Sequence, residues 1–290
     1  MSLPTIEQLR SQVLQIPASV TQAVRILQIT DCHLGETEGE QLVGMDTDVS
    51  LDHVLALIEQ EQFGGSATLP QLLLATGDLS NNGSTEAYQR LARKLQPLSL
   101  PLAWLSGNHD SAELMRDAVG PLLLPPLVLM GRWAIILLDS AVPGEVGGTL
   151  GSEELKKLEL LLQLASDAEH VLVCLHHQPV PIGCAWLDQQ QLSDSEAFFA
   201  ILQNEPRLRG ILWGHVHQDF SGTDPRVPGV QLLASPSTCI QFAPHQQSFK
   251  LDEQSPGYRW LDLHPDGSLV TEVSRLSNVE LSIDFASTGY

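Results

Sequence analysis

The feature that most constrains the fold is a series of short apolar segments, several of which end directly at Asp, Asn or His. These segments are VRILQIT, QLLLAT, PLAWLS, WAIILLDS, HVLVCL and LRGILW. Each has the length and apolar content of a buried strand. Windows typical of helices separate most of them, at 48–62, 84–96, 152–164 and 194–204. Alternating strands and helices, with strands that are mostly apolar, predict sheets covered on both faces.

The pattern changes near the end of the chain. Three short strands, VQLLAS, GYRWLDL and SLVTEV, follow one another with Gly, Pro and Asp turns and no helical window between them. This part predicts a second sheet packed against the first. The expected fold class is therefore α/β, a four-layer α/β/β/α sandwich that spans residues 24–275 as one domain.

Two terminal segments are set apart from that domain. Residues 1–23 are predicted to form an N-terminal arm or helix, because Ile6, Leu9, Val13 and Ile16 follow helical spacing. Residues 276–290 are predicted to form a C-terminal tail. Asp48 is a candidate cap for the helix at 48–62, and Ser84 for the helix at 84–96.

The composition and net charge of the chain limit which kinds of molecule it is expected to bind. The chain has 290 residues and a formal net charge of -20, from 15 basic and 35 acidic side chains. Such a surface repels nucleic acid, although bound metal ions would still allow a small anionic substrate. No run approaches the roughly 20 apolar residues of a membrane span, no signal peptide is recognisable, and the four cysteines form no CxxC pair. We expect free thiols, no membrane partner and a cytoplasmic location; the oligomeric state stays open.

Polar residues able to bind metal follow the predicted strands. They are Asp31 and His33, Asp78, Asn108 and His109, His176 and His177, and His215 and His217. In open α/β sheets, sites form at the carboxyl ends of the strands, so these side chains are expected to converge.

Each of these motifs taken alone also has a structural explanation. Asp-x-His is common, Gly-Asp is usually a turn, and Gly-Asn-His-Asp is also compatible with a turn. His176 and His177 could be a satisfied buried pair, whereas Gly-His-x-His more often binds metal. The five motifs occur in order, each after a predicted strand, and this coincidence favours a metal site.

The ordered set resembles the calcineurin-like metallophosphoesterase superfamily over about residues 24–275. Three further stretches are similar to the bacterial class III 3′,5′-cyclic AMP phosphodiesterases. They are LQITDCHLG, HHQPVPIGCAWLD and LLASPSTCIQFAPHQQSFKLDEQSPGYRWLDLHPDGSL. They lie partly outside the ligand motifs, so they favour this subfamily within the superfamily.

The resemblance implies a centre of two divalent metal ions. One ion would be held by Asp31, His33, Asp78 and His217, and the other by Asp78, Asn108, His176 and His215. Asp78 would bridge the pair. The mixed nitrogen and oxygen ligands suit Fe or Mn, with Zn as a further candidate.

The resemblance also implies a mechanism. A hydroxide held between the metals would attack phosphorus and convert 3′,5′-cyclic AMP to 5′-AMP, which lowers the level of this second messenger. His109 and Asn108 are the implied catalytic residues, and His109 would assist the leaving 3′-oxygen. The implied substrate-binding residues are His33, Asp78, Asn108, His109 and His217. Many related phosphatases orient this histidine with an Asp at the position of Asn81, so Asp110 is considered as a substitute.

Other interpretations remain to be weighed. The same metal core could serve a phosphodiesterase acting on glycerophosphodiesters or 2′,3′-cyclic nucleotides, or an inactive scaffold, which should have lost ligands. Cys32 is expected to point away from the site, because strand geometry alternates. Trp186 could stack on a base or only pack. Four histidines fit no motif: His53, His170, His245 and His264.

Overall fold

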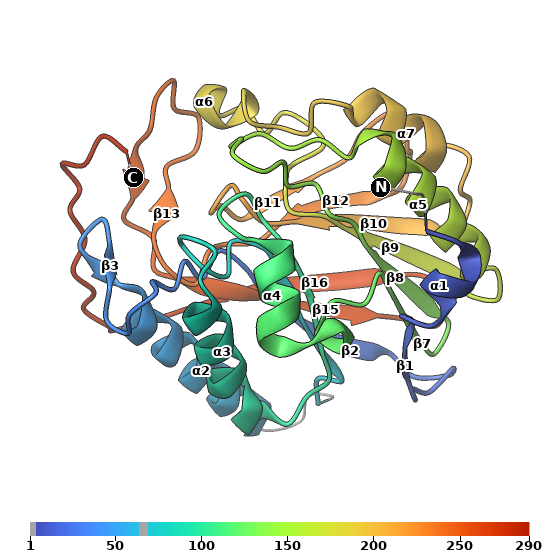
Figure 1. Cartoon of the computed structure of the whole chain (residues 1–290), viewed down its shortest axis with the longest axis horizontal. Helices are drawn as coiled ribbons and strands as arrows, with labels where there is room; N and C mark the ends of the chain where they lie inside the picture. The colour runs from blue at the N-terminus through green and yellow to red at the C-terminus, as the bar shows by residue number, and fades with distance from the viewer. Residues whose placement is uncertain (1–3, 64–68, 290) are drawn as a thin grey trace.

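Two sheets pack face to face and helices cover their outer faces, as the computed structural model shows for residues 4–63 and 69–289 (Figure 1). The five-stranded sheet has the order β16 (Leu269–Arg275), β15 (Gly257–Leu263), β2 (Val24–Ile29), β5 (Leu72–Thr76) and β6 (Leu102–Leu105). The seven-stranded sheet has the order β1 (Leu14–Ile16), β7 (Leu127–Met130), β8 (Trp133–Leu137), β9 (His170–Cys174), β10 (Leu208–Trp213), β12 (Gln231–Ala234) and β11 (Phe220–Gly222). This is the predicted four-layer sandwich.

Helices flank the two sheets on opposite sides. The five-stranded sheet is covered by α2 (Thr47–Phe63), α3 (Thr85–Leu95) and α4 (Ala112–Val119). The seven-stranded sheet is covered by α5 (Gly151–Leu164) and α7 (Ser195–Leu202). The remaining short elements are α1 (Ile6–Arg10), α6 (Ala185–Asp188), the 3-10 turns Gln96–Leu98 and Pro121–Leu123, and two hairpins, β3 (Gln41–Leu42) with β4 (Met45–Asp46) and β13 (Gln241–Phe242) with β14 (Leu251–Asp252).

Strand periodicity divides the core into three layers. In β5, Leu72 and Leu74 face the other sheet, whereas Leu73 and Ala75 face the helices, because successive side chains of a strand alternate. All four are fully buried. Both faces of these strands are therefore apolar, which explains why the segments lack the polar alternation of a half-exposed strand.

The late β-rich part does not form the second sheet, so that prediction was wrong. β12 pairs in parallel with β10 in the seven-stranded sheet, and β15 pairs antiparallel with β2 in the five-stranded sheet. Local periodicity indicated these strands correctly but carries no information about their partners. The second sheet is instead built mainly from β7–β10.

The terminal segments pack on the main body. Helix α1 ends at Arg10, and Leu14–Ile16 forms β1, paired with β7, so helical spacing misassigned this strand. Near the other end, Leu281 and Ile283 contact the core, and Asp284 N donates to Val43 O. The domain boundaries after residue 23 and before residue 276 stay predictions.

One of the two helix caps predicted from the sequence is confirmed. Ser84 accepts a hydrogen bond from Ala87 N at the start of α3, as predicted. At the start of α2 the capping acceptor is Asp46, which bonds Val49 N at 3.0 Å. Asp48 is instead buried against Arg90, with 2.8 Å between Oδ1 and Nε. Among the described helices, none is both long and apolar enough to cross a lipid bilayer.

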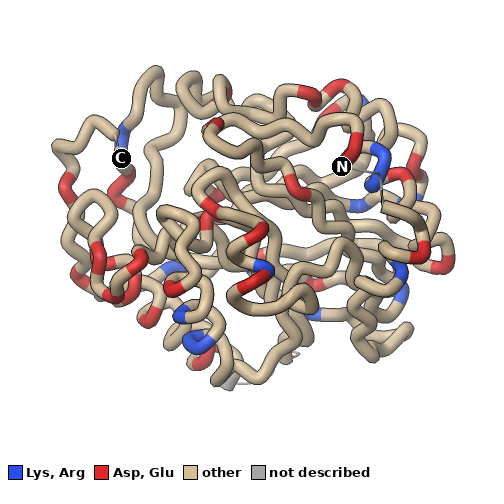
Figure 2. Tube along the Cα trace, viewed as in Figure 1, with Lys and Arg blue, Asp and Glu red and all other residues tan. Residues whose placement is uncertain are grey.

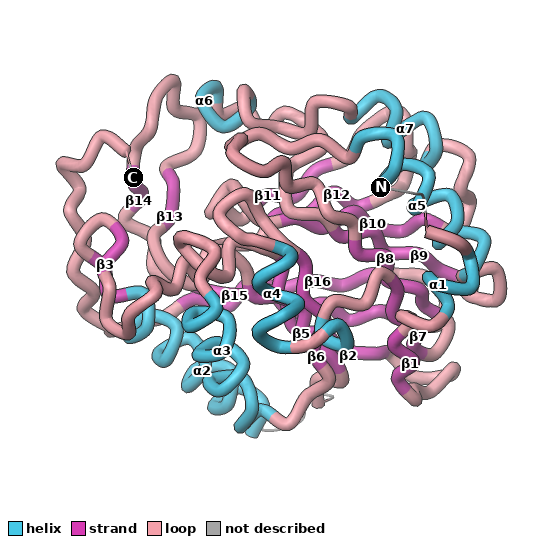
Figure 3. The backbone as a smooth tube through the Cα atoms, in the orientation of Figure 1, coloured by secondary structure: helices cyan, strands magenta, loops and turns pink. Residues whose placement is uncertain are grey.

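The loops that follow the parallel strands gather beyond one end of the two sheets (Figure 3). Strands β2, β5 and β6 run parallel in one sheet, and β8, β9 and β10 run parallel in the other. Parallel strands place their carboxyl ends at the same edge, so the polar residues that follow them meet there.

Candidate metal centre

The candidate ligands lie in turns with unusual backbone geometry. Five of the candidate ligands have a left-handed φ, between 45° and 65°: Asp31, His33, Asp78, His215 and His217. This conformation costs free energy for residues other than glycine and is concentrated at functional sites. Hydrogen bonds between neighbouring loops hold it in place, including Asp31 N to Gly77 O and His33 N to Asp78 O, both at 2.9 Å.

The first cluster consists of Asp31, His33 and His217. The Nε2 atoms of the two histidines are 3.2 Å apart, and His217 Nε2 is 3.3 Å from Asp31 Oδ1. His217 Nδ1 lies 2.8 Å from the main-chain oxygen of Ile240, and His33 Nδ1 lies 3.2 Å from Asn81 Oδ1. Because these oxygens accept, each Nδ1 carries the proton, and each Nε2 presents a lone pair to the same point.

The second cluster is centred on Asp78 and His176. His176 Nε2 is 3.2 Å from Asp78 Oδ2, and its Nδ1 is 2.8 Å from Thr76 O. Two buried atoms beside this pair have no hydrogen-bond partner in the described part of the chain, Asn108 Oδ1 and His215 Nε2. A buried acceptor without a partner calls for a ligand, and a metal ion fits both.

One oxygen of Asp78 faces both clusters. Asp78 Oδ2 is 3.2 Å from His176 Nε2 and 3.7 Å from His33 Nε2, whereas Oδ1 accepts from His109 N at 2.9 Å. Two of the four groups of residues able to hold a metal ion among the described residues contain Asp78, one with His33 and the other with His176. Its carboxylate can therefore contact two ions at once.

The electrostatics favour cations here. Burial raises the pKa of Asp78, but His176 outweighs it, so the pKa lies well below its usual value. Burial lowers the pKa of His33 to about 3, with His109 adding to the effect. For His176, burial is outweighed by the carboxylates of Asp78 and Asp31, which raise the pKa to about 9. The two carboxylates thus favour a positive charge beside Nε2 of His176. Either a proton or a metal ion bound to this nitrogen can provide that charge.

His176 and His177 differ in how their ring nitrogens are used. His177 Nδ1 lies 2.8 Å from Ser140 Oγ, and Nε2 lies 3.1 Å from Val146 O. Both ring nitrogens of His177 thus have protein partners, whereas His176 directs Nε2 toward the two carboxylates. Sequence reasoning ranked His176 first but gave no sign of the contacts of His177 with the loop of Ser140 and Val146.

His109 is held by a main-chain group. Its Nδ1 is 3.0 Å from Asn81 O, so the residue that replaces the expected Asp still contacts the histidine, through its backbone. The carboxylate of Asp110 accepts from the backbone N–H groups of Leu79, Ser80 and Gly107, and from Tyr88 OH. Burial, aided by Asp78, raises the pKa of Asp110 to about 6. Asp110 therefore holds the two ligand loops together.

The cysteines lie outside the candidate ligand set. All four are buried and free, as predicted. Cys32 packs in the apolar layer beneath α2 and α3, pointing away from the site, and burial raises its thiol pKa.

A cavity of about 260 Å³ opens beside the candidate ligands. Asp78, Asn108, His109 and His215 form one part of its wall, and Trp186, Phe242 and Phe249 form another. The sequence raised Trp186 as a candidate for stacking, but it gave no signal for Phe242 or Phe249, because lone aromatic residues usually pack.

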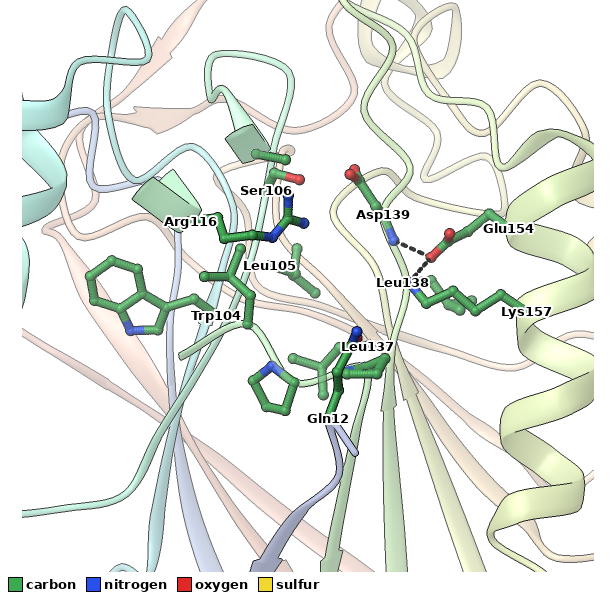
Figure 4. Close-up of a pocket in the computed structure, with 14 residues that line it drawn as sticks. Gln12, Trp104, Leu105, Ser106, Arg116, Leu137, Leu138, Asp139, Glu154 and Lys157 are labelled. Atoms are coloured by element: carbon green, nitrogen blue, oxygen red, sulfur yellow. Dashed lines mark hydrogen bonds and ion pairs between the residues drawn. The ribbon is translucent and has the colours of Figure 1, made fainter. Parts of the chain in front are cut away.

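A second cavity, of about 240 Å³, contains none of the candidate ligands (Figure 4). Arg116 lines one side, and Glu154 and Lys157 line the other. Lys157 is paired with Glu154 at 2.8 Å, and Glu154 also accepts from Asp139 N. Lys157 and Glu154 thus neutralise each other, and the candidate ligands line the first cavity and not this one.

The family follows from a comparison with known proteins. Residues 24–219 match the family described as calcineurin-like phosphoesterase. This chain belongs to the calcineurin-like phosphoesterase family. The matched region contains every candidate ligand, from Asp31 to His217.

Two relatives within this family are similar over nearly their full length. The chain is 44% identical to the 3′,5′-cyclic adenosine monophosphate phosphodiesterase CpdA of Pseudomonas aeruginosa, over 92% of this chain and 96% of the relative. It is 41% identical to the protein of the same name in Escherichia coli (strain K12), over 96% and 99%.

A more distant structural relative shows the same fold. The purple acid phosphatase PPD1 of yellow lupin superposes with a TM-score of 0.65 at 14% identity, over 94% of this chain and 57% of the lupin chain.

The surface outside the site is acidic. Asp and Glu are scattered along the chain and outnumber Lys and Arg (Figure 2). A net charge of -20 disfavours polyanions. Bound cations would still allow a small anion to enter the site, because they dominate the local field.

Proposed function

We propose that this chain hydrolyses 3′,5′-cyclic AMP to 5′-AMP at a centre of two divalent metal ions. The observation that carries the proposal is the 44% identity to a cyclic AMP phosphodiesterase over 92% of this chain. The gathered His and Asp clusters support it, because the catalytic equipment is present and not only the fold. Iron or manganese is the proposed metal, with zinc as a further candidate.

The proposed ligands are divided as the two clusters suggest. Asp31, His33, Asp78 and His217 would hold one ion, and Asp78, Asn108, His176 and His215 the other. When bound, the ions supply an activated water and positive charge for the phosphoryl oxygens. The tautomers support this division, since main-chain oxygens hold Nδ1 of His176 and His217 and leave Nε2 for an ion.

The remaining chemistry is assigned to the chain's own residues. His109 lines the cavity with Nδ1 bound to Asn81 O, so Nε2 is the atom that would protonate the leaving 3′-oxygen. Asn108 joins it in contacting substrate, as would His33, Asp78 and His217. An inactive scaffold should lack ligands, and all seven proposed positions are filled and lie together.

The decisive assay compares substrates and metals. Metal-free protein is reconstituted with Fe, Mn or Zn and offered cyclic AMP, cyclic GMP, 2′,3′-cyclic AMP and glycerophosphocholine. We expect cyclic AMP to be turned over with the highest kcat/KM and to yield 5′-AMP. A higher kcat/KM on glycerophosphocholine or 2′,3′-cyclic AMP would replace the proposal with the related phosphodiesterase.

Chelation provides a simpler check on the same material. Removal of the metals is expected to abolish turnover, and restoring one of the three metals should recover it. The fold should persist, because its three apolar layers do not depend on the site. Circular dichroism before and after chelation separates loss of metal from unfolding.

The pair His176 and His177 gives a sharper test of the ligand set. We expect His176→Ala to lose metal and activity, because Nε2 of this residue faces Asp78 and Asp31. His177→Ala is the matched control: it removes contacts with Ser140 and Val146 and should retain both metals. Elemental analysis decides; metal lost from the His177 variant and kept in the His176 variant would reverse the assignment.

A further inference from the structure

The aromatic part of the cavity wall adjoins the metal centre directly. Phe242 stacks on the ring of His217, a candidate ligand, with centroids 4.1 Å apart and an interplanar angle of 14°. Trp186 and Phe249 pack edge to face against Phe242, at 5.0 Å and 5.6 Å between centroids. A phosphate at the metals would therefore place the rest of a nucleotide beside these rings.

Two of the three rings remain partly exposed. Phe242 is buried, whereas Trp186 and Phe249 are half-buried and line the cavity. Rings that serve only as core are normally buried on all sides, and these two present surface to the cavity instead. Flat aromatic surface beside a phosphate site suits a nucleobase, because every base has a face that can stack.

Gln190 supplies a polar group at the same wall. It follows Trp186 by four residues and lies just after α6, where its main-chain N donates to Leu187 O at 2.9 Å and forms a turn. Both Gln190 and Trp186 line the cavity. Within residues 4–63 and 69–289, the carboxamide of Gln190 makes no hydrogen bond, whereas that of Gln189 donates to Ala185 O.

We propose that Gln190 recognises the adenine base and that Trp186 and Phe249 hold its ring faces. The inference rests on the proposed function and names the part of the site that selects the base. A carboxamide has one acceptor and one donor group, which match the 6-amino group and N7 of adenine. Guanine presents two acceptors, O6 and N7, at this edge, so the same carboxamide can satisfy only one of them.

The test compares substrates that differ only in the base. Wild type and Gln190→Ala are assayed with cyclic AMP, cyclic GMP and the 3′,5′-cyclic monophosphate of purine riboside, which lacks the 6-amino group. We expect wild type to prefer cyclic AMP over both, and Gln190→Ala to lose about tenfold or more of each preference in kcat/KM. Gln189→Ala is the matched control and should keep the wild-type ratios.

Trp186→Leu tests the stacking surface separately. Because stacking does not depend on the base, KM should rise by a similar factor for cyclic AMP and cyclic GMP, about tenfold, with their ratio kept. Metal content and circular dichroism confirm that each variant is folded. An unchanged KM for both substrates would exclude Trp186 from the base site.

The outcomes separate this inference from the proposed function. Hydrolysis of bis(p-nitrophenyl) phosphate, which has no base, is measured for wild type and Gln190→Ala as the reference for turnover without base recognition. If wild type cleaves cyclic AMP but Gln190→Ala keeps its base preferences, the role of Gln190 is overturned and the proposed function stands. If wild type cleaves bis(p-nitrophenyl) phosphate and not cyclic AMP, both proposals fail.

Discussion

Asp78→Ala is expected to abolish turnover of cyclic AMP and to deplete both metal ions. The reason is the position of Oδ2, which faces His176 at 3.2 Å and His33 at 3.7 Å, one residue from each cluster. A bridging carboxylate offsets the repulsion between two cations about 4 Å apart, so its removal weakens both sites at once. Metal content per chain, measured by elemental analysis, should fall from two toward zero.

Two further variants test whether the loss of metal comes from the missing charge of Asp78 and not from a general loss of structure. Asp78→Asn keeps the shape of the side chain and an oxygen for His109 N, so a loss of metals here isolates the missing charge. Asp46→Ala removes the carboxylate that caps α2, outside the site, and costs about 1 kcal/mol of stability. The Asp46 variant should retain both metals and full activity. Two metals per chain in Asp78→Ala would contradict the bridging role.

The sequence predicted the strands well because buried parallel strands carry a strong local signal. HVLVCL and LRGILW are mostly apolar, with one polar residue each, and both are observed as central strands of the seven-stranded sheet. No comparable signal in the sequence indicated which sheet each strand joins. GYRWLDL joined β2 through contacts more than two hundred residues apart in the chain, such as Leu261 with Ile26.

Short elements were predicted least well, for a related reason. Helical spacing of four apolar residues near the N-terminus included Leu14–Ile16, which became an edge strand because β7 offered it hydrogen bonds. Helix α4, directly after Asp110, was not predicted at all, although Ser111 accepts from Leu114 N as its cap. In both cases the neighbouring structure outweighs the local pattern.

The candidate ligands could be named from sequence because each is tied to the end of a strong strand signal. The groups that orient them could not, since most are main-chain oxygens. Thr76 O holds His176, Ile240 O holds His217, and Asn81 O holds His109. Every residue has a backbone oxygen, so the residue type at these positions does not indicate that the oxygen orients a histidine. The question of Asp110 illustrates this, because the contact came from the backbone of Asn81.

His109→Ala is expected to separate proton transfer from metal binding. The main-chain N of His109, not its ring, donates to Asp78 Oδ1, and alanine keeps that hydrogen bond. The variant should therefore retain near-full metal content. Turnover of cyclic AMP should fall by about 10²–10⁴-fold, the usual contribution of a positioned general acid. Metal analysis and steady-state kinetics on one preparation provide both measurements.

The choice of substrate then identifies what the ring does. Cyclic AMP must expel a poor alkoxide, so it depends on a proton from His109 Nε2, whereas the leaving group of bis(p-nitrophenyl) phosphate needs none. The loss should thus be much smaller for bis(p-nitrophenyl) phosphate. Equal losses on both substrates, with metals retained, would show that His109 positions the phosphate and donates no proton. Loss of metal would instead mean that the ring supports the centre itself, through its edge-to-face contact with His33 at 4.8 Å between centroids.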